Sequence, residues 1–292
     1  MGTILLMKNI ILNTDNNNTM ITDVLDNAKQ ILAKSGWVLL RGFPLNLTSF
    51  SQIIKLLCRQ LTFDPAREYS NNSTQKVNSG TSAIGLHIEN GNTPLPPDLV
   101  AFYSEKSANI GSQTTVCDGV EVYQNMSNEL KALFEHPITV SRTLPSKLWR
   151  QYVADQHPAI SSIDEVNEGH LDDLNALAPN QKAILNCDDS LTYRLAINPC
   201  IKGAFSEEIA FANAILGPSF NYEKPTVTLS TGEEISETLK QELTLLAERF
   251  THEISWQDND LVLIDNKRVM HGRRAIEGNT ADRQLHIGMG CL

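Results

Sequence analysis

The chain has 292 residues, of which 41% are hydrophobic, and its formal net charge is −10. This apolar content is enough for a sizeable core, and all-β proteins of this length often form one domain, so we expect a single domain over residues 1–292. An acidic chain lacks the basic surface that nucleic acids and anionic membranes require. No apolar run is long enough to cross a bilayer. We therefore expect a cytoplasmic protein that binds a small molecule rather than nucleic acid or membrane.

The cysteine pattern excludes two kinds of small-domain scaffold. The chain has five cysteines, an odd number, at wide spacings and without a CxxC pair. A disulfide framework or a structural zinc site would require paired or clustered cysteines. We therefore expect reduced thiols, most of them buried. The cysteines are Cys58, Cys117, Cys187, Cys200 and Cys291.

Three elements are predicted before residue 60. Residues 21–34 carry apolar side chains at helical spacing, and Ser35-Gly36 ends that pattern. Residues 37–40 (WVLL) then read as a buried strand. A second helix follows, for which Ser49 and Gln52 form a capping-box pattern. The start of the chain is therefore expected to run helix, strand, helix.

The central part of the chain has a different character. Residues 65–98 are rich in Asn, Ser, Thr, Gly and Pro, with short apolar runs between them. Residues 99–103 (LVAFY) and 113–116 (QTTV) predict strands, and the stretch 119–135 predicts helix. Residues 140–190 are polar and irregular. We interpret this segment as an insertion or lid within the domain, with a helical piece near 170–186.

The last third returns to regular patterns. Residues 237–250 are amphipathic at helical spacing, residues 261–264 (LVLI) predict a buried strand, and residues 283–287 predict a final strand. Many short strands with a few flanking helices indicate an α+β protein built around a β-sandwich or barrel.

One pair of segments carries metal-binding chemistry. His87 and Glu89 lie two residues apart, so on a strand both side chains would point to the same face. His271 lies just after the buried strand at 261–264 and supplies a third candidate ligand. Two histidines and one carboxylate on one face of an octahedron leave three positions open, as non-haem iron(II) oxygenases require. A His-x-Glu pattern by itself is also common as a satisfied structural pair.

Several motifs, in matching order and spacing, resemble the TauD/TfdA superfamily of iron(II)/2-oxoglutarate-dependent dioxygenases, and within it the clavaminate synthase-like group. The family fold is a double-stranded β-helix (a jelly roll), which the resemblance implies here. The motifs are residues 36–43 (GWVLLRGF), 87–89 (HIE), 97–99 (PDL), 111–114 (GSQT), 256–266 (WQDNDLVLIDN), 271–273 (HGR) and Arg283.

Carried onto these positions, the resemblance implies that His87, Glu89 and His271 bind Fe(II) and act in catalysis. It also implies that Arg283 pairs with the distal carboxylate of the cosubstrate 2-oxoglutarate, a role that suits the planar guanidinium fork. Thr114 would donate its hydroxyl to the same cosubstrate, and dioxygen would take the last open position. The alternative for Arg283 is a surface arginine without a ligand, and the alternative for Thr114 is a strand threonine without a role in binding.

Two positions depart from the family pattern. Asn259 stands where the family often has Gly, a mild change because Asn tolerates left-handed backbone geometry. Ile287 stands where a second Arg commonly follows the cosubstrate Arg, which puts in doubt any substrate anchor borrowed from that residue. Arg273 is a rival for the cosubstrate contact.

The resemblance implies decarboxylation of 2-oxoglutarate to succinate, coupled to oxidation of an unactivated C–H bond. Because Glu89 retains the carboxylate ligand, it favours hydroxylation over halogenation; desaturation, epoxidation and ring closure remain open. We expect an amino-acid-like or natural-product substrate, free or carrier-bound. Asn90, Asn92 and Arg194 are candidate contacts. A cupin-like metalloenzyme without 2-oxoglutarate, or a jelly-roll binding protein, are the alternatives from other classes, and the sequence offers no argument about oligomeric state.

Overall fold

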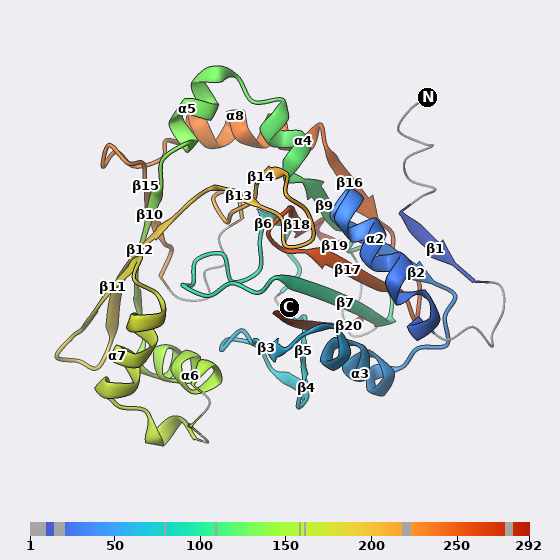
Figure 1. The fold of residues 1–292 in the computed structure, drawn as a ribbon, viewed down its shortest axis with the longest axis horizontal. Helices are drawn as coiled ribbons and strands as arrows, with labels where there is room; N and C mark the ends of the chain where they lie inside the picture. Colours follow the sequence, from blue (N-terminus) through green and yellow to red (C-terminus); the bar gives the residue numbers. More distant parts are fainter. Residues whose placement is uncertain are drawn as a thin grey trace.

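The protein is an α+β molecule in which two β-sheets face each other and helices lie outside them (Figure 1). This confirms the expected double-stranded β-helix core with flanking helices. The helices are η1 (Ile21–Val24), α2 (Leu25–Ser35), α3 (Leu47–Leu57), α4 (Gly119–Gln124), α5 (Asn128–Phe134), α6 (Ser146–Gln156), η2 (Ile163–Glu165), α7 (Glu168–Leu177) and α8 (Glu237–Glu248). The computed structural model describes residues 10–14, 21–78, 80–108, 110–157, 159–160, 162–217, 223–277 and 283–292.

The larger sheet has eight strands in the order β1-β2-β17-β7-β20-β5-β4, with β3 paired to β20. β17 runs antiparallel to both β2 and β7, so these three apolar strands lie side by side in the sheet. The strands are β1 (Ile11–Asn13), β2 (Trp37–Arg41), β3 (Gln60–Leu61), β4 (Tyr69–Asn71), β5 (Thr74–Lys76), β7 (Leu99–Lys106), β17 (Leu261–Asp265) and β20 (Gln284–Cys291).

Both faces of this sheet are buried, which explains why its central strands are apolar without alternation. On β7, Leu99 and Tyr103 pack in the cluster formed with α2 and α3. Val100 and Phe102, one residue out of phase, pack in a second cluster between the two sheets. The strand period of two therefore divides one hydrophobic run between an outer and an inner core.

The smaller sheet has the order β16-β9-β18-β6 and is antiparallel throughout. It carries two of the candidate metal ligands. Its strands are β6 (Ile84–His87), β9 (Thr114–Asp118), β16 (Thr251–Ile254) and β18 (Val269–Arg273). Two-stranded ladders join β8 (Ile110–Gly111) to β19 (Ile276–Glu277) and β13 (Cys200–Lys202) to β14 (Ile209–Phe211).

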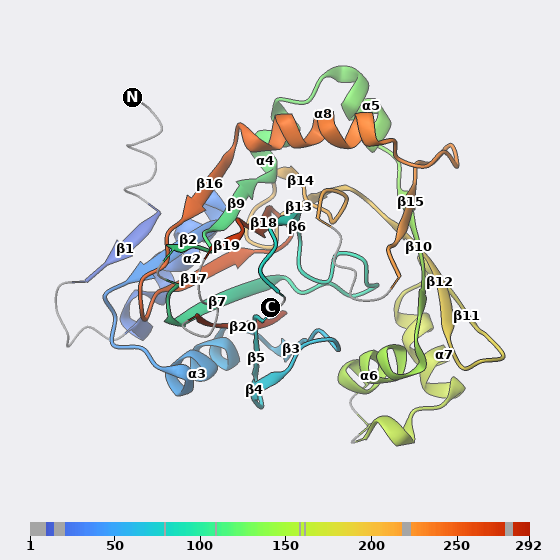
Figure 2. The same ribbon diagram turned by 180° about the vertical axis from the view of Figure 1, so that it is seen from behind.

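A third group of elements, which we call the lateral unit, lies beside the jelly roll in both ribbon views (Figure 2). It consists of a four-stranded sheet with the order β11-β12-β10-β15, together with α6 and α7. Its strands are β10 (Ile138–Leu144), β11 (Gln181–Leu185), β12 (Leu191–Ile197) and β15 (Thr226–Thr228). The lateral unit includes most of the segment expected to form a lid; that role, and the single domain, stay predictions.

The structure corrects three local expectations. α3 begins earlier than predicted, because Asn46 is the N-cap and Ser49 completes the capping box, so Gln52 has no part in it. The helical piece near 170–186 ends at Leu177, and the residues after it form β11. The helix over 119–135 is two helices, α4 and α5, because Ser127 caps a new one.

All five cysteines are free, but only Cys58 and Cys117 are buried, so the expectation that most would be buried is wrong. Burial raises the pKa of Cys58 and Cys117 to about 12, which keeps both thiols protonated and unreactive. None of the helices in the described residues combines the length and the apolar character that a bilayer crossing needs.

Candidate metal centre and adjoining cavities

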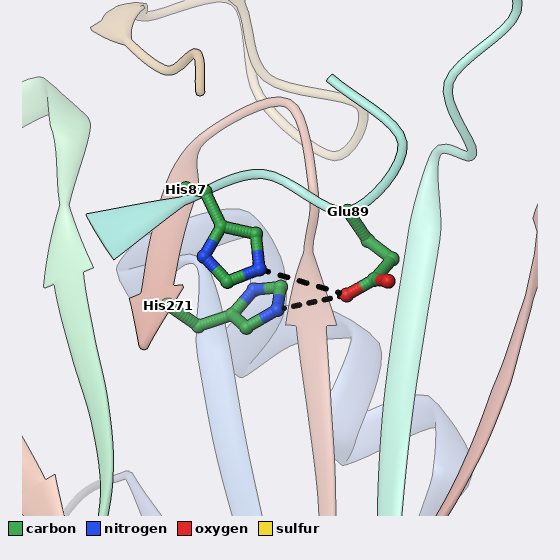
Figure 3. A group of neighbouring side chains, drawn as sticks. All are labelled: His87, Glu89 and His271. Atoms are coloured by element: carbon green, nitrogen blue, oxygen red, sulfur yellow. Dashed lines mark hydrogen bonds and ion pairs between the residues drawn. The ribbon is translucent and has the colours of Figure 1, made fainter. Parts of the chain in front are cut away.

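Three side chains converge between the two sheets (Figure 3). His87 is the last residue of β6 and lies opposite His271 of β18 in the strand register. Glu89 lies beyond the end of β6, because the Ile88 amide donates to the Asn213 carbonyl instead of continuing the ladder. The expectation that His87 and Glu89 share one strand is therefore wrong in detail. Glu89 nevertheless turns toward the histidines.

The distances suit one metal ion. Glu89 Oε2 lies 3.2 Å from His271 Nε2 and 3.9 Å from His87 Nε2, and one ligand atom from each residue falls within 4.8 Å of the others. A metal with ligand bonds of about 2.1 Å at right angles holds neighbouring donor atoms about 3 Å apart. Two imidazoles and one carboxylate are the donor set of a 2-His-1-carboxylate iron site. The residues present therefore fit iron(II).

The protonation states also suit a metal. His87 Nδ1 lies 2.8 Å from the Gly85 carbonyl, which can only accept, so a neutral ring presents the lone pair of Nε2 to the site. Burial and the neighbouring His271 lower the pKa of His87 to about 4. Burial alone would raise the pKa of Glu89, but the charge of Arg67 and the hydrogen bond from His271 hold it well below its usual range. Neutral imidazole and ionised carboxylate are the forms that bind cations.

Two residues that the sequence did not single out fix Glu89. Asn266, fully buried, accepts from the Glu89 amide at 2.8 Å and donates to the Glu89 and Pro97 carbonyls. Arg67 donates to Glu89 Oε1 at 2.7 Å. Asn266 lies in the motif at 256–266, so its proximity to the site could have been inferred. Arg67 lies in an irregular segment without periodicity, and nothing in the sequence places it here.

A small cavity of about 40 Å³ adjoins the histidines on the jelly-roll side, and Arg283, Arg273 and Thr114 line it. Arg283 Nε donates to Ser112 Oγ at 3.1 Å and its Nη1 to the Val77 carbonyl at 3.0 Å. Burial and the positive charge of Arg273 lower the pKa of Arg283 to about 10. Arg67 also lines this cavity, and three guanidinium groups around it favour an anionic ligand.

Thr114 is oriented for donation. Its Oγ1 accepts the indole N–H of Trp256 at 2.9 Å. That bond uses a lone pair and leaves the hydroxyl hydrogen available for a ligand. The three residues expected at the cosubstrate site, Thr114, Arg283 and the rival Arg273, therefore all line the same small cavity beside the metal ligands.

A profile of the family described as "Taurine catabolism dioxygenase TauD, TfdA family" matches residues 12–289 of the chain. The chain belongs to the TauD/TfdA family. It is accordingly an iron(II)- and 2-oxoglutarate-dependent dioxygenase, an oxidoreductase that uses dioxygen and acts on a small molecule.

Three similar proteins are each distant from this chain in sequence. The dapdiamide synthesis protein DdaC of Enterobacter agglomerans is 22% identical over 287 residues, which cover 87% of this chain and 82% of that protein. A taurine dioxygenase structure from Burkholderia xenovorans has a TM-score of 0.60 and 14% identity, covering 97% of this chain and 86% of that one. PvcB from Pseudomonas aeruginosa has a TM-score of 0.56 and 13% identity, over 96% and 84%. These structural similarities show the shared jelly-roll fold.

A second, much larger cavity of about 480 Å³ reaches from the candidate metal ligands His87 and Glu89 to the lateral unit. His87 and Glu89 line both cavities, so the candidate metal ligands lie where the two cavities meet. Asn90 and Asn92 line the large cavity, as expected, whereas Arg194 is exposed on β12 and does not.

The wall of this cavity includes a close backbone contact. A Cβ atom on Gly85 would lie 2.2 Å from the Leu216 carbonyl oxygen, and one on Gly217 would lie 2.0 Å from the Gly85 carbonyl oxygen. Only glycine permits this approach. The contact holds residues 213–217 against β6, next to His87.

Proposed function

We propose that His87, Glu89 and His271 hold the iron of this dioxygenase and that Arg283 and Thr114 bind 2-oxoglutarate. The observation that carries the proposal is the junction of the cavities: the three candidate ligands lie where a small, arginine-lined cavity meets a large one. When bound, iron(II) would allow dioxygen to oxidise both 2-oxoglutarate, which loses carbon dioxide to become succinate, and the substrate, so that each takes up one oxygen atom.

The chain's own residues orient the cosubstrate. The distal carboxylate lies against Arg283, whose position is set by Ser112 and the Val77 carbonyl. Thr114 donates its hydroxyl to the same group. The charge of Arg273 strengthens the attraction for a dianion in this buried cavity. Arg273 Nη2 donates to the Ser82 carbonyl at 2.7 Å, and Arg283 Nη1 likewise donates to the Val77 carbonyl at 3.0 Å. The choice of Arg283 as the direct contact therefore rests on the resemblance of its sequence position to the TauD/TfdA pattern.

The substrate occupies the large cavity, and the reaction is hydroxylation of an unactivated C–H bond. Glu89 supports hydroxylation, because a retained carboxylate ligand leaves no position for halide. The similarity to DdaC, a dapdiamide synthesis protein, supports an amino-acid-like, natural-product substrate. Family membership favours this function over a cupin-like enzyme or a binding protein.

The test is turnover with a panel of amino acids and their acylated or carrier-bound derivatives, with succinate and product measured together. We expect substrate-dependent succinate formation and a product heavier by one oxygen atom. A product lighter by two hydrogen atoms would assign desaturation or ring closure instead. If no panel member increases succinate formation above the substrate-free rate, the amino-acid-like substrate is wrong.

A further inference from the structure

The end of the large cavity that lies in the lateral unit is mostly apolar, although Arg142 of β10 and Gln181 of β11 also line it. α6 contributes Leu148, Trp149, Tyr152 and Val153, α7 contributes Leu171 and β12 contributes Leu191. All but Leu148 belong to a hydrophobic cluster that is separate from the clusters of the jelly roll. The lateral unit therefore supplies its own small core, and one side of that core faces the cavity.

The opposite end of the cavity is polar and adjoins the metal ligands. His87, Glu89, Asn90, Arg67 and Asp64 line it. A ligand that fills the cavity therefore has its polar and reacting part near the metal and an apolar part against the lateral unit. The volume of about 480 Å³ falls in the range of roughly 300–1,000 Å³ typical of pockets for drug-sized ligands. A free amino acid would leave the apolar end unfilled.

We infer that the lateral unit forms a subsite for an apolar extension of the substrate, such as an acyl chain or a second, apolar residue joined to an amino-acid-like head group. This inference rests on the proposed function, which places the substrate in this cavity. It changes the expected substrate class from a free amino acid to an acylated or dipeptide-like one. Apolar area removed from water supplies the affinity.

Calorimetric titration of the iron(II)- and 2-oxoglutarate-loaded protein tests the subsite with leucine, N-hexanoyl-leucine and N-octanoyl-leucine as probes. We expect the octanoyl compound to bind at least about tenfold more tightly than leucine, because each buried methylene adds affinity. Equal affinities for leucine and its acyl derivatives, or no binding of either acyl compound, would overturn the inference.

Cavity-filling variants show where the acyl group of the probe binds. Leu171→Trp narrows the apolar end and should remove most of the gain from the octanoyl group while leaving leucine binding unchanged. Leu177→Trp is the matched control, because Leu177 lies on the same helix, is 70% exposed and does not line the cavity. If the octanoyl group still increased the affinity of the Leu171→Trp variant, the acyl group would bind elsewhere. Because calorimetry does not depend on chemistry at the metal, failure here is distinguishable from failure of the iron and 2-oxoglutarate assignment.

A second inference comes from the contacts of Arg67, which link Glu89 to the loop that contains Asp64. Arg67 donates through Nη2 to Glu89 Oε1 at 2.7 Å, and its Nε lies 3.3 Å from Asp64 Oδ2. Asp64 is held in turn by Gln75, which accepts from its amide and donates to its carbonyl, both at 2.9 Å. The guanidinium therefore lies between two carboxylates, with a hydrogen bond to Glu89 and an ion pair with Asp64.

We propose that Arg67 is a positioning residue that keeps Glu89 bound to iron through one oxygen. With Oε1 engaged by Arg67, only Oε2 faces the histidine nitrogens. A carboxylate that bound through both oxygens would take one of the three positions that 2-oxoglutarate and dioxygen need. Because Asn266 holds the Glu89 backbone, the ligand is constrained at both ends. This role also rests on the proposed function.

Arg67→Gln tests this role through iron(II) affinity and the d–d spectrum of the cobalt(II)-substituted protein. We expect about 10- to 100-fold weaker iron(II) binding, typical for loss of a group that orients a metal ligand, and a cobalt spectrum shifted toward higher coordination. Arg67→Lys should recover part of the affinity through its charge but not the wild-type spectrum, since it lacks the planar fork. Arg59→Gln, at an exposed arginine eight positions away, is the matched control.

An unchanged cobalt spectrum and iron(II) affinity in Arg67→Gln would contradict the proposal. If that variant does not fold, Asp64→Asn removes the ion pair behind Arg67 and should move both readouts in the same direction by a smaller amount. If wild-type protein binds iron without any effect of 2-oxoglutarate, the proposed function fails rather than the role of Arg67.

Discussion

The jelly roll and the lateral unit meet at one cavity but contribute to it in different ways. The jelly roll presents polar groups such as His87, which lies at the end of β6 opposite His271 in the strand register. The lateral unit presents apolar side chains from helices α6 and α7. Strand register fixes the direction of a side chain closely, as the chemistry at a metal requires. Residues on the helix faces of the lateral unit pack on their own small core, so they can be substituted with little effect on the strand register of the jelly roll. The comparison indicates that the first region sets the reaction and the second sets the substrate.

The sharpest test of this division removes a ligand from the jelly roll. We expect His87→Ala to lower iron(II) affinity by at least about 100-fold, more than loss of a group that only orients a ligand. Equilibrium dialysis with metal analysis measures the affinity. His136→Ala, at an exposed histidine, is the control and should bind iron normally. Normal iron binding by His87→Ala would remove this residue from the ligand set.

The next largest effect should fall on the cosubstrate. Arg283→Ala should raise the KM for 2-oxoglutarate by about 10- to 100-fold, because a charge-assisted hydrogen bond contributes about 1.5–3 kcal/mol. Steady-state succinate formation at varied 2-oxoglutarate measures the change. Arg274→Ala is the control, since Arg274 pairs with Glu248 and Glu253 at the surface. An unchanged KM for Arg283→Ala would transfer the role to another residue.

The candidate metal ligands and Arg283 were predictable from the sequence, whereas the position of Arg67 and the structure of the lateral unit were not. Motif order identified the candidate ligands and Arg283, since strands bring positions 87 and 271 together wherever the jelly roll forms. The left-handed conformation of Asn259, with φ of 68°, agrees with its place in a turn where the family often has Gly. Arg67 was missed because its position depends on loop packing against Asp64 and Gln75. The lateral unit was read as irregular because short, mixed helices and strands leave weak periodicity.

A subtler change concerns the residue behind Arg283. Ser112 adopts φ of 66°, a conformation unfavourable for a residue with a Cβ, and its hydroxyl accepts from Arg283. Ser112→Ala keeps the backbone strain of the left-handed conformation and loses the hydrogen bond to Arg283, whereas Ser112→Gly loses both the strain and the hydrogen bond. We expect each variant to raise the KM for 2-oxoglutarate by about 3- to 10-fold, from the loss of about 1 kcal/mol of hydrogen bonding.

Thermal unfolding separates the two Ser112 variants. Ser112→Gly should be the more stable, because glycine adopts left-handed geometry without the steric penalty of about 1–2 kcal/mol. Equal KM values for Ser112→Gly and the wild type would show that Arg283 does not need this support.

The smallest effect on the metal chemistry should come from the lateral unit. Arg150 stacks on Trp149 and joins α6 to Asp189 at 2.8 Å. Arg150→Ala should lower Tm by about 2–4 °C, the shift that a loss near 1 kcal/mol produces in a chain of this size. Affinities for iron(II) and 2-oxoglutarate should not change. Arg194→Ala, at an exposed arginine on β12, should leave Tm unchanged. A large loss of iron binding in Arg150→Ala would break the division between the two regions.

The most direct test of the metal and cosubstrate assignment is an anaerobic titration of the apo protein with iron(II) and then 2-oxoglutarate, followed by visible absorption. Chelation of a 2-oxo acid at an iron with open positions produces a metal-to-ligand charge-transfer band. We expect this band in the wild type, its loss in His271→Ala and a much higher 2-oxoglutarate requirement in Arg283→Ala. Iron binding without the band in the wild type would contradict the assignment of the small cavity to 2-oxoglutarate.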